Sequence, residues 1–189
     1  VSLMRELSLN VMDIVQNSIS ASATSIQIKV TENRELCMLS IEIDDNGKGM
    51  STEQVANVQD PFFTTRTTRK VGLGVPLFKM AAEQTGGSFS ITSVLGKGTT
   101  VVANFKTNSV DMTPLGDIND TVKLLIGCNP EIDFLFTHSV DNSSFSLNTV
   151  ELREILGNDV PLNSPDVTLW IKEFLQEQNA KLYGGAANS

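Results

Sequence analysis

Three short segments carry side chains whose type and spacing could bind a metal, a ring or an anion. In the first, Asp13 and Asn17 lie four positions apart, so on a helix they share one face, one turn from each other. A carboxylate in that position can activate a water while the amide oxygen binds Mg²⁺. An Asp/Asn pair on a helix surface is usually just solvated, so this segment decides nothing alone.

The second segment, DDNGKGM at residues 44–50, places a carboxylate at the end of a predicted strand. Asp45 can accept a hydrogen bond from an exocyclic amine. Gly47 and Gly49 lack side chains that would block a flat ring, and they permit positive φ. The same composition also makes an ordinary tight turn, so both interpretations stay open here.

The third segment, KVGLGVPLF at residues 70–78, opens a predicted helix. Gly72, Leu73 and Gly74 would present free backbone N–H groups and the positive end of the helix to an anion. Arg66, Arg69 and Lys70 add positive charge just before them, where phosphate groups would be stabilised. A solvated basic loop is the alternative interpretation.

Hydrophobic periodicity predicts the elements that must position these segments. Helical spacing covers residues 2–22, and strand-like alternation covers 25–31 and 36–45. A capping box at 51–54 opens a short helix, a longer helix spans 75–85, and 88–94 with 99–106 form a hairpin. Two long helices would cover one face of a mixed β-sheet, which predicts an α/β fold of the two-layer sandwich type.

The remainder of the chain differs in charge. Residues 1–107 hold ten Lys/Arg and ten Asp/Glu, which sum to zero, whereas residues 108–189 hold four and twelve, which gives −8. We therefore expect a linker at 108–120, a small acidic α+β accessory domain at 121–183 and a disordered tail at 184–189. The acidic charge argues against nonspecific nucleic-acid binding.

Within the expected accessory domain, strands are predicted at 122–127, 132–140 and 144–148, followed by a short helix at 150–157. A last helix is predicted to have Ser164 as its N-cap and Pro165 as its first residue. Its apolar stripe is predicted to pack on the rest of the chain rather than to dock a partner, and consists of Val167, Trp170, Ile171, Phe174 and Leu175.

Several common classes of protein are disfavoured. The sequence has no run of eighteen apolar residues, so it predicts no membrane span. The first residues do not resemble a signal peptide, and a cytoplasmic location is expected. Cys37 and Cys128 are predicted to be buried thiols, and His138 is the sole histidine, with a structural or surface role expected. This composition argues against a zinc site or a catalytic triad.

Together, these segments resemble the ATPase superfamily of histidine kinases, gyrase, mismatch-repair proteins and heat-shock chaperones, known as GHKL or Bergerat-fold proteins. DIVQNSISASAT is similar to the N box in its mismatch-repair form, and IDDNGKGM resembles the first glycine box. DPFFTTR resembles an element of histidine kinases. The second glycine box and its helix resemble VGLGVPLFKMAAEQTGG, and the terminal strand of the family resembles GKGTTVVANF. The resemblance covers residues 3–107 and implies a histidine-kinase-like ATP-binding domain at 1–107.

The resemblance implies a role for each matching residue. Asp13 corresponds to the residue that orients the attacking group, where Glu or Asn is commoner, and Asn17 to the Mg²⁺ ligand. Asp45 corresponds to the residue that recognises adenine, with Gly47 and Gly49 beside the base. ATP and Mg²⁺ are the implied cofactors.

Further positions follow from the same resemblance. Gly72–Gly74 match the turn that cradles phosphate, Thr99 supports Asp45 and the adenine through water, and Arg66 corresponds to a lid residue that touches phosphate. The first glycine of the family's lid motif is Lys70 here, which puts turnover in more doubt than binding.

Three functions are compatible with this resemblance. The first is transfer of the γ-phosphoryl group to a protein partner in trans. The second is slow ATP hydrolysis that switches a conformation or a dimer. The third is nucleotide sensing without catalysis, in which the acidic segment contacts a protein. A protein partner is expected in the first and third cases, and a homodimer is left open.

Overall fold

The computed structural model describes residues 6–63, 73–157 and 159–184. Helices and strands are interspersed along the described residues. In order, they are α1 Leu7–Ser20, β1 Ser25–Asn33, β2 Met38–Asp45, α2 Thr52–Val58, α3 Gly74–Gln84, β3 Ser88–Val94, β4 Gly98–Lys106, α4 Ile118–Cys128, β5 Asp133–Val140, β6 Ser143–Asn148, α5 Thr149–Leu156 and α6 Pro165–Leu182.

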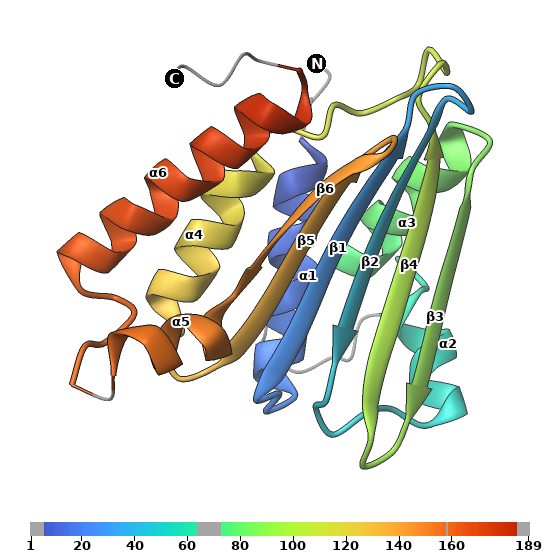
Figure 1. Cartoon of the computed structure of the whole chain (residues 1–189). Coiled ribbons are helices and arrows are strands. Elements are labelled where there is room, and N and C mark those ends of the chain that lie inside the picture. The colour runs from blue at the N-terminus through green and yellow to red at the C-terminus, as the bar shows by residue number, and fades with distance from the viewer. Residues whose placement is uncertain (1–5, 64–72, 158, 185–189) are drawn as a thin grey trace.

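The strands form one mixed sheet in the order β3-β4-β2-β1-β5-β6. Neighbours pair antiparallel except β1 and β5, which run parallel. Burial alternates along the central strands, so one face of the sheet meets the core and the other meets solvent. Figure 1 shows α1, α3, α4 and α6 packed together on the covered face. The predicted two-layer α/β sandwich is therefore confirmed.

Helix α1 lies at the centre of the helical layer and contacts both α3 and α4. Its inward residues recur at helical spacing and are at most 2% exposed, namely Leu7, Val11, Ile14 and Val15. The amide groups of Leu7 and Ser8 donate to the carbonyls of Pro114 and Leu115. The first turn of α1 is thus fixed to the segment before α4, and its last turn reaches the opposite end of the sheet (Figure 1).

One predicted strand is a helix. Residues 122–127, expected as a strand, belong to α4. The side chain of Asp117 accepts a hydrogen bond from the amide of Asp120 and caps this helix. Val122, Leu125 and Ile126 then fall at helical spacing and are buried, whereas a six-residue apolar run has no periodicity that separates a strand from a helix.

The prediction of two buried thiols was also wrong. Cys128, at the end of α4, is exposed, and Cys37, in the turn between β1 and β2, is only half-buried. Cys37 has φ +51° and lies in that turn rather than in either strand.

The predicted boundary between residues 107 and 121 runs through one continuous structure. Strand β5 pairs with β1 from the register Ser25 with Asp133 to Glu32 with Val140, and β6 pairs with β5. The residues of α4, β5, β6 and α6 also contribute to the same hydrophobic core cluster as α1 and β1. The acidic segment therefore extends the sheet and its helical layer.

Helix α6 covers this extension. It begins at Pro165 after Ser164, as predicted, and its buried residues Val167, Ile171 and Leu175 face the core. Trp170 from the predicted stripe is 45% exposed and stacks on Phe174. None of the described helices is both long enough and apolar enough to cross a membrane.

Candidate functional site

A cavity of about 260 Å³ opens at the end of the sheet where α1 and β2 finish. The end of α1, the turn after β2, the start of α3 and strands β3 and β4 surround it. Its lining residues are Ile14, Asn17, Ser18, Ser20, Ala21, Asp45, Lys48, Gly49, Met50, Val58, Val75, Ile91, Thr99 and Val101. In Figure 1 the last turn of α1, the end of β2 and the β3–β4 turn all lie toward the lower end.

Asp45 is the one acidic side chain among these lining residues, and it is 8% exposed. Its Oδ2 accepts a hydrogen bond of 2.6 Å from the Ser18 hydroxyl, and its Oδ1 accepts one of 2.8 Å from the Gly47 amide. A carboxylate has about four lone-pair sites, so two remain for a ligand. Asp45 is thus a carboxylate that two hydrogen bonds fix in place, and it can still accept hydrogen bonds from a ligand in the cavity.

Thr99 lies opposite Asp45 in the register of β2 and β4. Its Oγ1 is 2.8 Å from the hydroxyl oxygen of Ser93, which also accepts from the Met50 amide at 2.8 Å and donates to the Gly98 carbonyl at 3.0 Å. A hydroxyl has one hydrogen to donate, so Thr99 donates to Ser93 and keeps its own lone pairs for water or a ligand. The predicted pair of Asp45 and Thr99 is therefore brought together.

Two glycines at this site are required by the backbone. A Cβ on Gly49 would lie 2.0 Å from the Val94 carbonyl oxygen, and its φ is +67°. A Cβ on Gly47 would lie 2.9 Å from both the Ala21 carbonyl oxygen and Asp45 Oδ1. Gly49 borders the cavity, whereas Gly47 is not among its lining residues. Both glycines permit close approach of neighbouring chain segments. The sequence prediction gave a different reason for these glycines, namely that they leave room for a flat ring.

Helices α1 and α3 meet beside the cavity. Asn17 lines the cavity, and Asp13 lies one turn earlier on the exposed side of α1. A Cβ on Gly74, the first residue of α3, would lie 2.8 Å from the Asp13 Cβ, so glycine allows the two helices to touch. Leu73 is the N-cap residue of α3 and is 52% exposed. Three predicted site residues, Arg66, Lys70 and Gly72, lie outside the described residues.

The start of α3 has anion-binding character. No side chain within the described residues caps this helix, and no acidic residue stands in its first turn. Its first N–H groups, at Gly74 and Val75, are followed by Pro76, which has none. An uncapped helix N-terminus of this kind favours a negatively charged group.

Sequence reasoning missed Ser18 and Ser93, which hold Asp45 and Thr99 in place. Ser18 is 3% exposed, and its position four residues after Ile14 on α1 is a signal that it faces inward. Ser93 shows no comparable signal, because its role depends on the hairpin register that sets it opposite Thr99. Apolar walls complete the cavity, formed by Ile14, Val75, Ile91 and Val101.

The described residues contain no group of three or more His, Cys, Asp or Glu side chains that could hold a metal ion. One oxygen donor at the cavity on the α1 side is the Asn17 amide oxygen. Mg²⁺ commonly takes one or two protein ligands and completes its shell with phosphate oxygens and water. A single amide donor next to an anion-binding helix end fits that mode of binding.

Comparisons with known proteins agree with this geometry. Residues 2–109 match the family described as histidine kinase-, DNA gyrase B-, and HSP90-like ATPase. The chain is 30% identical over 105 residues to the sensor histidine kinase ZraS of Escherichia coli K12, covering 56% of this chain and 22% of that protein. It is 40% identical over 82 residues to the sensor protein SrrB of Staphylococcus aureus NCTC 8325, covering 41% and 14%.

The chain therefore spans less than a quarter of the length of these curated relatives. Among solved structures, the N-terminal domain of a DNA repair protein shares the fold at a TM-score of 0.50 and 16% identity, covering 95% of this chain and 57% of that one. The family match spans more than half of the chain and contains the cavity of Asp45. The chain belongs to the family of histidine kinase-, DNA gyrase B-, and HSP90-like ATPases.

Proposed function

We propose that this protein binds Mg-ATP and transfers the γ-phosphoryl group to a residue of a protein partner. The observation that carries the proposal is Asp45, a buried carboxylate with spare acceptor capacity at the wall of a largely apolar cavity. The sensor kinases among its relatives favour phosphoryl transfer over other uses of ATP.

Recognition of adenine would depend on Asp45 and on the walls around it. Asp45 would accept a hydrogen bond from the exocyclic amine, and Thr99 would hold a bridging water with its free lone pairs. The apolar side chains of Ile14, Ile91 and Val101 would pack against the faces of the ring. An amine left without its acceptor in such a cavity costs about 1–3 kcal/mol, which gives the carboxylate its selectivity.

The phosphate groups would extend from the cavity toward α1 and α3. The Asn17 amide oxygen would bind Mg²⁺, and the first N–H groups of α3 would face the phosphate oxygens. Bound ATP supplies the phosphoryl group, whose transfer depends on positioning and on stabilisation of charge. Asp13, one turn from Asn17, would orient the attacking group.

The phospho-acceptor is proposed to lie on another molecule. His138 is the chain's sole histidine, and it is 1% exposed with its Nε2 hydrogen-bonded to Glu32 at 2.8 Å. A ring held in this way inside the sheet layer does not present a nucleophile to an incoming phosphoryl group.

The test is incubation of the full chain with γ-labelled ATP, Mg²⁺ and the isolated histidine-bearing part of a sensor kinase as acceptor. We expect labelled acceptor with the wild type and at least about tenfold less with Asn17→Ala. Gln16→Ala, an exposed neighbour on the same helix that does not line the cavity, is the matched control. Absence of label on the acceptor while ATP is bound would refute transfer without refuting nucleotide binding.

A second candidate is slow hydrolysis, favoured by the exposed carboxylate of Asp13 beside the start of α3. There it could orient a water rather than a protein nucleophile. Hydrolysis would be selected over transfer if the wild type releases inorganic phosphate but labels no acceptor. Asp13→Ala should then abolish the phosphate release and still bind ATP.

A further inference from the structure

Strand β6 forms an open edge of the sheet. It is the last strand in the sheet order, and among the described residues it pairs with β5 alone. Its sequence, SSFSLN, has no charged residue and no proline, and its register with β5 runs without a bulge. Charges, prolines and bulges are devices by which natural edge strands avoid pairing with another chain. Strand β6 therefore lacks three of these devices.

Backbone groups on the outer side of β6 are free to pair. The amides of Asp133 and Asp141, at the two ends of β5, donate toward β1, so the odd-numbered residues of β5 face β1 and the even-numbered ones face β6. Ser144 and Ser146 pair with odd-numbered residues of β5, so their N–H and C=O groups point away from the sheet. No backbone hydrogen bond to another described segment uses these groups.

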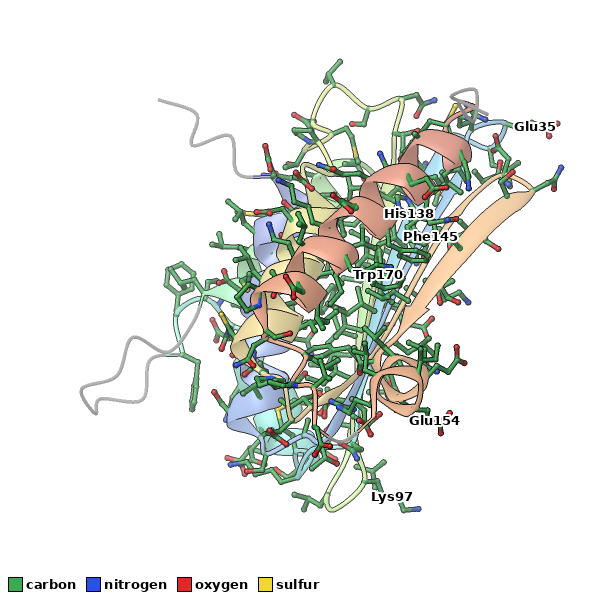
Figure 2. The ribbon with its side chains drawn as sticks, turned by 60° about the vertical axis from the view of Figure 1, so that its left-hand side comes forward. Glu35, Lys97, His138, Phe145, Glu154 and Trp170 are labelled. Atoms are coloured by element: carbon green, nitrogen blue, oxygen red, sulfur yellow. The ribbon has the colours of Figure 1, made fainter. Side chains whose placement is uncertain are left out.

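Aromatic side chains line the covered side of this edge. Phe145 of β6 meets Phe174 of α6 edge-on with ring centroids 6.4 Å apart, and Phe174 stacks on Trp170 at 5.1 Å. Figure 2 shows Phe145 between α6 and β6, and Trp170 on α6. Trp170 is about half exposed, and so is available for apolar contact. A strand added to β6 would direct every second side chain toward this aromatic group.

Acidic side chains surround the exposed indole ring. Asp166 and Glu173 occupy exposed positions one turn before and one turn after Trp170 on α6. On α5, which follows β6 directly, Glu151 and Glu154 are exposed, and Figure 2 shows Glu154 at the lower end of this side. A partner with complementary charge would therefore be basic.

The basic residues of α5 and α6 do not cancel this charge. Residues 149–182 contain three Lys/Arg and six Asp/Glu, which gives −3. Of the three, Arg153 is engaged with the Asp133 carboxylate and with two backbone carbonyls, and Lys181 pairs with Glu177 at 2.6 Å. The third, Lys172, lines the groove on the α4 side of α6.

We propose that β6 accepts an extended, basic segment of a protein partner as an additional strand. Its backbone pairs with Ser144 and Ser146, its apolar side chains cover Trp170, and its Lys or Arg side chains are attracted by the acidic residues of α5 and α6. A second copy of this chain would bring the same acidic helices to the interface, where like charges repel. None of these residues lines the cavity of Asp45, so the proposal does not depend on nucleotide binding.

Trp170 makes the test direct, because it is the sole tryptophan of the chain and its fluorescence reports on this surface. The full chain is titrated with a synthetic peptide that alternates lysine and valine and is about six residues long, the usual length of a strand. We expect a saturable shift of the Trp170 emission to shorter wavelength. Binding should weaken as the salt concentration rises from about 0.05 M to about 0.5 M.

Two matched peptides separate charge from backbone pairing. The first alternates glutamate and valine, so it keeps the apolar side chains and reverses the charge. The second is the lysine peptide with every amide N-methylated, so it keeps the charge and has no backbone donor. We expect neither peptide to shift the Trp170 emission.

Variants of the protein test the same contacts from the other side. Ser146→Pro removes an outward N–H and leaves the pairing with β5 intact, and it should weaken binding of the lysine peptide at least about tenfold. Glu173→Lys reverses a charge beside Trp170 and should also weaken binding. Leu169→Ala is the matched control, because Leu169 is exposed on α6 but lies five residues before Phe174, on a different face. It should bind like the wild type.

Unchanged emission with the lysine peptide, equal binding of either matched peptide, or unaltered affinity in Ser146→Pro would each overturn the proposal. The peptide comparison uses the unaltered protein, so it decides the question even if Ser146→Pro does not fold. Sedimentation of the wild type alone tests the alternative occupant. Self-association that Ser146→Pro abolishes would assign the edge to a second copy of the chain and would likewise overturn the proposal.

Discussion

The molecule holds two buried polar clusters at opposite ends of one sheet, and they differ in completeness. At the end that holds the Asp45 cavity, which we call the nucleotide end, each oxygen of Asp45 already has a donor, from Ser18 and from the Gly47 amide. At the other end, Glu32 has two donors, but His138 Nδ1 has none among the described residues. In the first cluster both carboxylate oxygens are held by the protein, whereas in the second one ring nitrogen has no partner among the described residues.

The clusters also differ in how the chain assembles them. At the nucleotide end, the turn after β2 lies in contact with neighbouring backbone segments. The positions of its residues therefore depend on glycines and on backbone geometry. The other end depends on side chains that come from separate elements, β1, α4, β5 and α6. We therefore expect backbone changes to have their largest effect at the first end, whereas a side-chain change that removes a donor should affect either end.

The largest expected effect is that of Gly49→Ala. A Cβ there would meet the Val94 carbonyl at 2.0 Å in a positive-φ conformation, so we expect a loss of about 3 kcal/mol or more in unfolding free energy. Gly96→Ala is the control, with φ +75° but nothing within 4 Å, and should lose about 1 kcal/mol. Urea unfolding measures both, and equal losses would show that the close approach at Gly49 contributes nothing.

An intermediate effect is expected for Ser18→Ala. This change removes the 2.6 Å donor to the buried Asp45 carboxylate, so we expect about 1–3 kcal/mol lower stability and weaker ATP binding. Ser8→Ala, at the other end of the same helix, removes a 3.3 Å bond to Glu6 and should cost less than about 1 kcal/mol. Urea unfolding measures the stability of both variants, and calorimetry measures their affinity for ATP. An unaltered ATP affinity in Ser18→Ala would argue against a role of Ser18 in positioning Asp45.

The smallest expected effect is that of Tyr183→Phe, which removes one donor to Glu32. Since Tyr183 is 44% exposed, solvent limits the loss to about 1 kcal/mol near pH 7. The pKa of Glu32 is lowered in the folded state, so its contribution is present above its unfolded pKa and is lost as the pH falls through its folded pKa.

The difference between wild type and Tyr183→Phe should therefore shrink on acidification. Chemical unfolding at a series of pH values from about 7 to about 3 measures it. A difference that stays constant over this range would mean that the hydroxyl acts independently of Glu32 ionisation.

Much of the nucleotide end could be predicted from sequence, because its residues lie in short motifs. Asp45 and Gly49 share one turn, and Asn17 follows Asp13 on one helix face. The pairing of Asp45 with Thr99 also followed, because the resemblance linked the two. Ser93 was missed, since only the hairpin register shows which hydroxyl faces Thr99.

The other end could not be predicted in the same way. The contact between Glu32 and His138 spans more than one hundred residues and requires the parallel pairing of β1 with β5. Hydropathy predicted β5 as a strand but did not place it beside β1, and it assigned the apolar residues of α4 to a strand. The roles of Arg66, Lys70 and Gly72 stay predictions, because these residues lie outside the described part of the chain.

Calorimetric titration of the full chain with Mg-ATP tests the role of Asp45 most directly, with Asp44→Asn as the matched control. Asp44 is the preceding residue of the same strand, so its side chain points to the opposite face, where Thr100 donates to it. We predict that wild type and Asp44→Asn bind with similar affinity, and that Asp45→Asn binds at least about tenfold more weakly. No ATP uptake by the wild type, or equal binding by Asp45→Asn, would contradict the assignment of Asp45 as the adenine-recognising residue.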